Sequence, residues 1–262
     1  MSIETAMDFR PSGQLLGKVA LVTGSGRNIG RAIALLAATE GASVAVNGSA
    51  DQAAVDGVVA EITAAGGHAI GVMCDVSDPD AVEKMVERVE AELGPVDVVV
   101  NNVGRRKAKT FDELTVADWR SVMSTNLDSV FYVSRCVLPG MKERGWGRVI
   151  NISGYDGFTG HIAKRAANVT AKAGMHGLTK AIAREYSGFG VTANTVAPGA
   201  IFTQREESDY SHIDVEAMLA RIATHSVGHS DDIAAACLYL AAESGRFVTG
   251  QVIHVNGGEF MF

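Results

Sequence analysis

The 262-residue sequence is poor in cysteine, proline and aromatic residues. Its three cysteines, Cys74, Cys136 and Cys237, lie far apart without metal-ligand spacing, so we expect them in the core and expect no bound metal. With 5 prolines against 29 glycines, and with 47% of residues apolar, the composition predicts a compact core with tight turns.

An excess of basic residues is also missing. The formal net charge of −7 argues against nucleic acid as a partner, because binding to phosphates needs a basic surface. The first 17 residues, MSIETAMDFRPSGQLLG, contain acids and no continuous apolar region, so they predict neither a signal peptide nor a membrane anchor. We therefore expect a cytoplasmic protein without a membrane partner.

Short apolar runs alternate with longer helical patterns along the chain. The runs, all rich in Val and Ile, are KVALVT, SVAVN, HAIGVMCDV, VDVVVN, RVINIS, VTANTVAP and QVIHV. Helical patterns cover about 29–40, 53–65, 80–93, 115–143 and 172–187. Strands that are apolar throughout and separated by helices predict an α/β fold: a doubly wound, Rossmann-like parallel sheet of about seven strands with helices on both faces. We expect an N-terminal tail over 1–14 and a single domain over 15–262, with a lid at about 200–230.

A glycine-rich turn, TGSGRNIG at 23–30, follows the first expected strand and opens the first expected helix. Gly24 permits a sharp turn, Gly26 a close approach of a ligand, and Gly30 close packing of the helix on the sheet. The free N–H groups of that helix suit a pyrophosphate, so this stretch predicts a dinucleotide site.

The choice of dinucleotide depends on the end of the second expected strand. NAD enzymes have an acid there for the ribose hydroxyls, whereas this chain has Asn47, Gly48 and Ser49. Arg27 can pair with a phosphate, so we favour NADP(H) over NAD(H). Asp51 keeps NAD(H) open, because a small backbone shift would bring it to the ribose.

Several ordered motifs resemble the short-chain dehydrogenase/reductase family from about residue 17 to residue 262. They are TGSGRNIG, CDVSD, NNVG at 101–104, STNLDSVF, NIS, AKAG, NTVAPGAIFT and VTGQVIHVNGG. The resemblance implies an NAD(P)-dependent oxidoreductase that forms a homotetramer. The cofactor residues that it and the glycine turn imply are Gly24, Ser25, Arg27, Asn28, Ile29, Gly30, Asn47, Gly48, Ser49, Asp75, Val76, Asn102, Val103, Gly104, Lys172, Pro198, Gly199, Ile201 and Thr203.

The catalytic positions that the family implies are only half matched. Lys172 and Asn126 correspond to the family's Lys and Asn, but Asn168 stands at the Tyr position and Gly154 at the Ser position. An amide has no proton to give near neutral pH. We therefore predict a rearranged proton donor, with Tyr155 as first candidate because enoyl reductases of the same superfamily carry a tyrosine at a similar position. A Tyr155 ring packed under the lid, and catalysis by His161, remain open alternatives.

Two basic clusters, RRKAK at 105–109 and Lys164 with Arg165, are expected beside the cleft of an otherwise acidic protein. They are either a solvated surface or a site that attracts an anion. The sequence thus predicts an NADP(H)-dependent oxidoreductase with catalytic residues Asn126, Tyr155 and Lys172, reducing a carbonyl or an activated C=C in a small molecule that is a carboxylate, phosphate or CoA ester. The alternatives are a non-redox enzyme of the same fold, for elimination or isomerisation, and a cofactor-binding pseudoenzyme.

Overall fold

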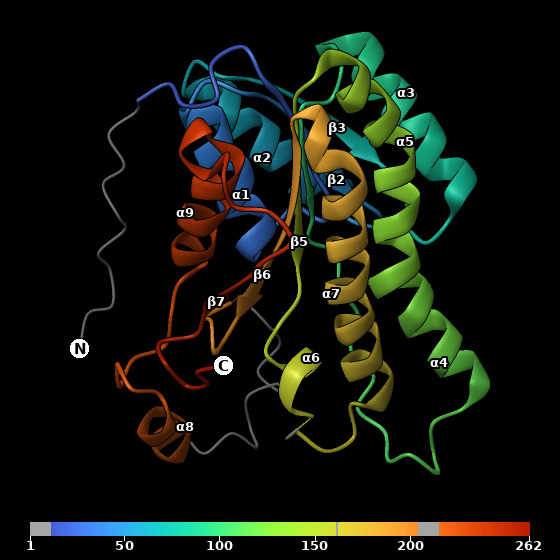
Figure 1. Ribbon diagram of the computed structural model, residues 1–262, viewed down its shortest axis with the longest axis vertical. Helices are drawn as coiled ribbons and strands as arrows, with labels where there is room; N and C mark the ends of the chain where they lie inside the picture. Colours follow the sequence, from blue (N-terminus) through green and yellow to red (C-terminus); the bar gives the residue numbers. More distant parts are fainter. Residues whose placement is uncertain (1–11, 161, 204–214) are drawn as a thin grey trace.

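Seven parallel strands form one sheet in the computed structural model, which describes residues 12–160, 162–203 and 215–262 (Figure 1). The strands are β1 (Val19–Val22), β2 (Ser43–Gly48), β3 (His68–Met73), β4 (Val98–Asn101), β5 (Gly147–Ile152), β6 (Val191–Pro198) and β7 (Val252–Val255). Each lies within a predicted apolar run or extends one residue beyond it, and β1, β4 and β5 are buried along their whole length. The predicted doubly wound sheet is confirmed.

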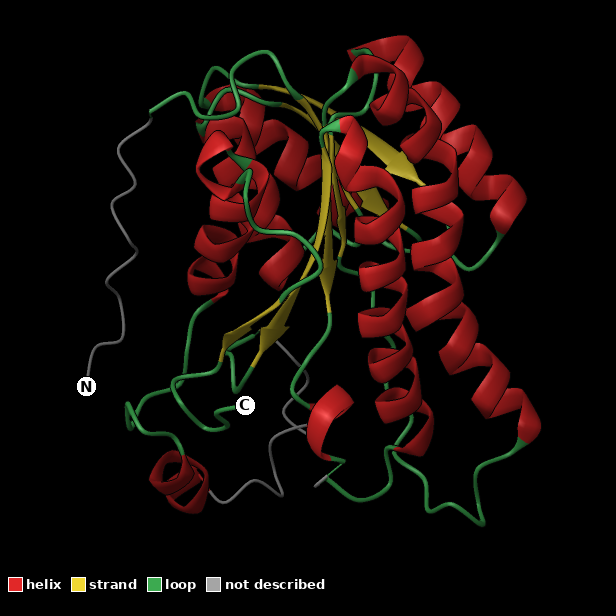
Figure 2. Cartoon of the chain, viewed as in Figure 1, coloured by secondary structure: helices red, strands yellow, loops and turns green. Residues whose placement is uncertain are grey.

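Helices cover both faces of this sheet (Figure 2). Apolar side chains of α1 (Asn28–Thr39), α2 (Gln52–Ala64) and α9 (Ser230–Ala241) share one buried cluster with the strands. Those of α3 (Pro79–Leu93), α5 (Ser129–Arg144) and α7 (Ala166–Tyr186) share a second cluster. Each fully buried Val, Leu or Ile side chain contributes about 1.5–3 kcal/mol, so these two clusters hold the sheet rigid beneath the loops.

The strand order, β3-β2-β1-β4-β5-β6-β7, reverses direction between β1 and β4. Connections after β1 lead to one edge of the sheet, and those after β4 lead to the other. At such a reversal the loops that leave the carboxyl ends of the two strands separate, and ligands of this fold class bind in the crevice between them. The glycine-rich turn after β1 and the loop after β4 border this crevice.

Two helix boundaries differ from the sequence prediction. The predicted helix 115–143 consists of α4 (Val116–Met123), a π-helical turn at Ser124–Asp128, and α5. The helix predicted from residue 172 starts six residues earlier, as α7, and its N-cap residue Arg165 makes no side-chain cap hydrogen bond that would have marked the start. Because α7 begins at residue 166, Asn168 and Lys172 lie one helical turn apart on the same face.

The predicted tail and lid lie partly outside the described residues, because 1–11 and 204–214 are not described. Ser12 and Gln14 donate backbone N–H groups to the buried Glu40 carboxylate, so contacts with the domain begin before the predicted boundary at residue 15. In the described part of the lid segment, α8 spans Val215–Arg221, and Ile201 bridges to Gly228. Among the described helices none is long and apolar enough to cross a membrane.

Candidate active site

The turn between β1 and α1 is too tight for side chains at two of its glycines. Gly24 has φ +61°, and a Cβ there would lie 2.9 Å from Val103 Cγ2. A Cβ on Gly30 would lie 2.3 Å from the Gly24 carbonyl oxygen and 2.6 Å from Asn102 Nδ2. Larger residues would displace the turn, so the structure agrees with the reasons for which the sequence analysis singled out these glycines.

Polar side chains hold the backbone of this turn in place through hydrogen bonds. Ser25 Oγ donates to the Val22 carbonyl at 2.7 Å, and Asn47 Oδ1 accepts from Gly24 N–H at 3.1 Å. Asn102 Nδ2 donates to the carbonyls of Thr23 and Gly24, both at 3.0 Å. Ser25, Asn47 and Asn102 were predicted as cofactor residues, and their side chains in fact hold the backbone that would contact it.

The N-terminus of α1 keeps hydrogen-bonding capacity for an anion. The N-cap residue of this helix is the exposed Arg27. Its side chain makes no cap hydrogen bond, so it does not satisfy the first N–H groups of the helix. Together with the glycine cradle, this end fits the pyrophosphate of a dinucleotide, which residues 24–30 would hold.

The end of β2 presents Gly48 and the exposed Ser49. Asn47 Nδ2 donates inward, to the carbonyls of Val72 and Cys74, so its side chain does not face a ribose there. Asp51, the acid that left NAD(H) open, is the N-cap of α2, and its carboxylate accepts from Ala54 N–H at 3.0 Å. The helix start therefore already uses this carboxylate.

Asp75, one of the predicted cofactor residues, follows β3 in the loop that leads to α3. Its carboxylate accepts from the backbone N–H of Ser77 at 3.0 Å and from its hydroxyl at 2.8 Å. These bonds, the backbone one first, lower the pKa of Asp75. The side chain is thus fixed and ionised. Val76, next to it, is buried.

Lys172 projects from α7 to the end of β5. Its side chain is nearly buried, and Nζ donates to the carbonyl of Ile152, the last residue of β5, at 2.7 Å. Burial and then the Arg106 guanidinium lower the pKa of Lys172 to about 8, while Asp156 opposes them. A Cβ on Gly104 would lie 3.9 Å from Nζ, so the ammonium also borders the loop after β4.

Asn126 lies in the π-helical turn at Ser124–Asp128 and is fully buried. Its Oδ1 accepts from Arg105 N–H at 2.7 Å, and its Nδ2 donates to the Arg105 carbonyl at 2.8 Å and to Asn168 Oδ1 at 3.0 Å. The structure therefore brings together Asn126, Asn168 and, one turn further along α7, Lys172.

Tyr155 is the third residue after β5 and directly precedes the short helix α6 (Asp156–Thr159). Its ring lies 4.9 Å from that of Phe260, between ring centroids, so the ring packs on the C-terminal segment. Burial raises the pKa of Tyr155, and the carboxylates of Glu259 and Asp156 raise it further. The hydroxyl therefore keeps its proton at neutral pH and remains a hydrogen-bond donor.

A pair that the sequence analysis did not find lies beside this loop. Ser153 Oγ and His176 Nε2 are 2.9 Å apart, and the Phe158 ring stacks on the imidazole with 4.4 Å between centroids. Burial, and then the positive charge of Lys172, lower the pKa of His176 to about 4. The neutral imidazole thus helps to position the segment that carries Tyr155. In the sequence, the only sign of this contact is a histidine, His176, within the otherwise apolar stretch AGMHGL.

His176 predicts an acid-sensitive fold. The unfolded chain binds a proton at this histidine near pH 6.5 and the folded protein only near 4, so the free energy of unfolding falls as pH drops through that window and is unaffected above it. The full loss amounts to about 3 kcal/mol. In urea unfolding at pH 7 and pH 4.5, His176→Leu should lose less stability than wild type between the two pH values. The variant of an exposed histidine, His68→Gln, should behave like wild type, and an equal acid loss in His176→Leu would contradict this account.

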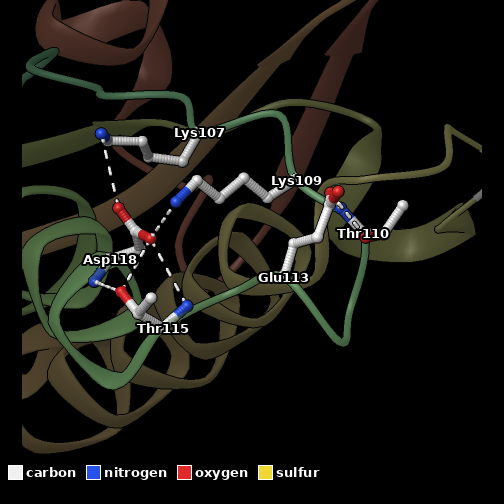
Figure 3. A network of polar contacts seen from close by, with 6 residues as sticks. All are labelled: Lys107, Lys109, Thr110, Glu113, Thr115 and Asp118. Carbon is white, nitrogen blue, oxygen red and sulfur yellow. Dashed lines mark hydrogen bonds and ion pairs between the residues drawn. The ribbon is translucent and has the colours of Figure 1, made fainter.

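The two basic clusters lie side by side, because Lys109 N–H donates to the Lys164 carbonyl at 3.1 Å. Three of their basic side chains form ion pairs, and Figure 3 shows the two that share Asp118. Lys107 and Lys109 contact the two oxygens of Asp118 at 3.4 Å and 2.7 Å, and these bonds, that of Lys109 first, hold the pKa of Asp118 far below its usual range. Arg165 pairs with Asp156 at 2.9 Å.

Arg106 acts electrostatically on two of the predicted catalytic groups. Its positive charge, after burial, lowers the pKa of Lys172, and together with Arg165 it opposes the rise in the pKa of Tyr155. The solvated-surface interpretation therefore fits Lys107 and Lys109, and the anion-attracting interpretation fits Arg106.

The remaining predicted cofactor residues follow β6. Gly199 N–H donates to the Val255 carbonyl at 2.9 Å, and a Cβ on Gly199 would lie 2.6 Å from Asn256 Cα. Pro198 ends β6, Ile201 bridges to Gly228, and Thr203 is buried. They lie at the carboxyl end of β6, at the same edge of the parallel sheet as the glycine turn. His161 lies outside the described residues.

Comparisons with known proteins agree with this architecture. Residues 24–259 match a family model described as Enoyl-(Acyl carrier protein) reductase. The chain is 38% identical to the 3-oxoacyl-(acyl-carrier-protein) reductase FabG of Staphylococcus aureus strain Mu50, over 93% of this chain and 98% of the relative. It is 37% identical to the protein of that name from Salmonella typhimurium strain LT2, over 94% and 98%. A crystal structure of a dehydrogenase/reductase from Sinorhizobium meliloti 1021 superposes with a TM-score of 0.88 at 36% identity, covering 95% of this chain and 98% of that one.

Proposed function

The chain belongs to the short-chain dehydrogenase/reductase family, and on that premise we propose an NADP(H)-dependent reductase with a rearranged proton donor. The chain is an oxidoreductase of this family type. We propose that it reduces a carbonyl or an activated C=C in a small anionic molecule. One observation supports the proposal: Lys172 Nζ bonds to the last residue of β5 and Asn126 bonds to the loop after β4, beside a cradle that fits a dinucleotide.

NADP(H) is supported by the charges at the end of β2. Ser49 is exposed there, and the carboxylate of Asp51 caps α2. Arg27, exposed in the glycine turn, offers a positive charge to a 2′-phosphate.

The proposed choice of NADP(H) predicts a measurable difference between the affinities for NADPH and NADH. The purified protein should bind NADPH at least about tenfold more tightly than NADH, because a charged hydrogen bond to phosphate contributes about 1.5–3 kcal/mol. Fluorescence titration measures both constants, and Arg27→Gln should remove most of the difference while Arg31→Gln, on the exposed side of α1, should not. A clear preference of the wild type for NADH would refute the assignment.

The proposed proton donor, Tyr155, differs from the tyrosine that the family uses. A bound reduced nicotinamide supplies a hydride, and the carbonyl oxygen of the substrate then gains negative charge. Tyr155 would donate its hydroxyl proton, or a hydrogen bond, to that oxygen. Lys172 would hold the nicotinamide ribose, and Asn126 would order a water relay. The raised pKa of Tyr155 keeps the hydroxyl protonated near neutral pH, so that its proton is available to the substrate oxygen.

Arg106 is proposed to attract the anionic part of the substrate. Arg106→Gln should raise KM for an anionic substrate about tenfold at low salt and leave kcat less affected, because one charged hydrogen bond is lost. Lys107→Gln is the matched control, since that side chain already pairs with Asp118. Steady-state kinetics at two salt concentrations measure both variants. An unchanged KM in Arg106→Gln would discard the substrate-binding role.

The reaction class is tested by following NADPH at 340 nm with a panel of enones, quinones, keto acids and acyl-CoA esters. Oxidation of NADPH with any of them supports the proposal. Conversion of a panel compound without a change in absorbance would favour the non-redox alternative instead.

We also propose a cytoplasmic location and a homotetrameric assembly. Three free cysteines, of which Cys74 and Cys237 are buried, suit the reducing cytoplasm. Exposed apolar side chains on α5 and at the C-terminus, including Phe131, Met261 and Phe262, are suited to contacts in a homotetramer.

A further inference from the structure

Asn168, at the position where the family has its tyrosine, is held in one orientation. It is the third residue of α7 and is only 5% exposed. Its Oδ1 accepts a hydrogen bond from Asn126 Nδ2 at 3.0 Å. The direction of its amide therefore depends on how the amide of Asn126 is fixed.

Asn126 is fixed by a single peptide segment that both donates and accepts. Arg105 N–H donates to Asn126 Oδ1 at 2.7 Å, and the Arg105 carbonyl accepts from Asn126 Nδ2 at 2.8 Å. Exchanging O and N in the Asn126 amide would set donor against donor and acceptor against acceptor. Nδ2 of Asn126 must therefore face Asn168, and Asn168 must accept this hydrogen bond through its amide oxygen.

The NH₂ group of Asn168 consequently points away from Asn126. Within the described residues it has no hydrogen-bond acceptor, yet it is not among the buried side-chain atoms that lack a partner, so it keeps contact with solvent. Lys172 lies one turn along the same face of α7. A nearly buried residue thus keeps an N–H donor in contact with solvent, one helical turn from the buried Lys172.

We infer that Asn168 is a catalytic residue that donates an amide hydrogen bond to the substrate's carbonyl oxygen and stabilises the charge formed there without transferring a proton. The inference rests on the proposed function and deepens it. Asn168 and Tyr155 would then divide the work of the family's single tyrosine: a non-titrating donor fixes the oxygen, and the hydroxyl of Tyr155 handles the proton. A preorganised donor of this kind is worth about 10²–10³-fold in kcat.

The isosteric variant Asn168→Asp tests this role. A carboxylate keeps an oxygen for Asn126 but replaces the N–H donor by a second acceptor. Thr170→Asp, which places the same charge on the exposed side of the same helix, is the control. With acetoacetyl-CoA and NADPH near neutral pH, Asn168→Asp should lose about 100-fold or more in kcat, and activity should recover as pH falls and the carboxyl gains a proton that it can donate. Thr170→Asp should match wild type.

A binding measurement separates this inference from the proposed reaction. In the presence of NADP⁺, wild type should bind 4-nitrophenolate, an oxyanion probe read by its absorbance, and Asn168→Asp should bind it at least about tenfold more weakly. Wild type that oxidises NADPH with no panel compound but binds the phenolate through Asn168 would overturn the proposed function, while the oxyanion-binding role of Asn168 would be supported. Active wild type with unchanged kcat and phenolate affinity in Asn168→Asp would overturn the inference alone, as would failure of wild type to bind the probe.

Discussion

Replacing Lys172 by methionine is expected to lower kcat/KM by about a thousandfold, at the upper end of what removal of one preorganised charged group costs. The ammonium is nearly buried, and it lies between the end of β5 and the loop after β4. Methionine has a similar length but neither charge nor donor, so the nicotinamide ribose and the charge formed on the substrate both lose their partner. NADPH oxidation with the panel compound that wild type reduces best measures the effect.

The loss should be chemical and not a failure to fold. A buried, incompletely paired charge contributes little to stability, so the melting temperature of Lys172→Met should stay within a few degrees of wild type, at about the scale of one lost hydrogen bond. Lys180→Met, at an exposed position on the same helix, should keep full activity. Wild-type activity should also decline as pH rises through about 8, where the ammonium of Lys172 loses its proton. Full turnover in Lys172→Met would remove this residue from the mechanism.

Tyr155→Phe is expected to lower kcat by about 10²–10⁴-fold, the usual range for a proton-transferring side chain. Its affinity for NADPH should change by less than about twofold, because no cofactor contact is assigned to the hydroxyl. The ring contact with Phe260 survives the substitution, so the loop after β5 should keep its place. Single-turnover kinetics and a fluorescence titration give the two numbers.

Tyr239→Phe, on the exposed side of α9, is the matched loss of a hydroxyl and should be indistinguishable from wild type. If Tyr155→Phe also turns over normally, the ring serves packing against the C-terminal segment and the proton comes from another group.

The strands of the sheet and the glycine-rich turn were predictable because short stretches of sequence determine them. Runs such as VDVVVN are apolar at every position, which only a strand covered on both faces accommodates. Gly24 and Gly30 sit at fixed offsets from β1, so the turn that fits a dinucleotide could be read from their spacing. The start of α7 was missed because Arg165 provides no side-chain cap and the first turn is not amphipathic enough to mark it.

Side-chain roles in the site depended on contacts that no local pattern encodes. Asn47 was assigned to the cofactor from its position at the end of β2, and no local pattern indicates that its amide turns inward to the carbonyls of Val72 and Cys74. Lys107 and Lys109 of the basic run pair with Asp118, which lies beyond the following loop, in α4. The Asn126–Asn168 pair spans 42 residues and needs a π-helical turn to form, so its meaning for Asn168 emerged only from the structure.

A crystal structure with NADPH bound tests the central claim most directly. The account predicts the pyrophosphate at the N-terminus of α1 and the nicotinamide ribose within about 3 Å of Lys172 Nζ, with the Tyr155 hydroxyl and the Asn168 amide facing the reactive side of the ring. A cofactor held elsewhere, or a ribose that leaves Lys172 bonded to the Ile152 carbonyl alone, would contradict it.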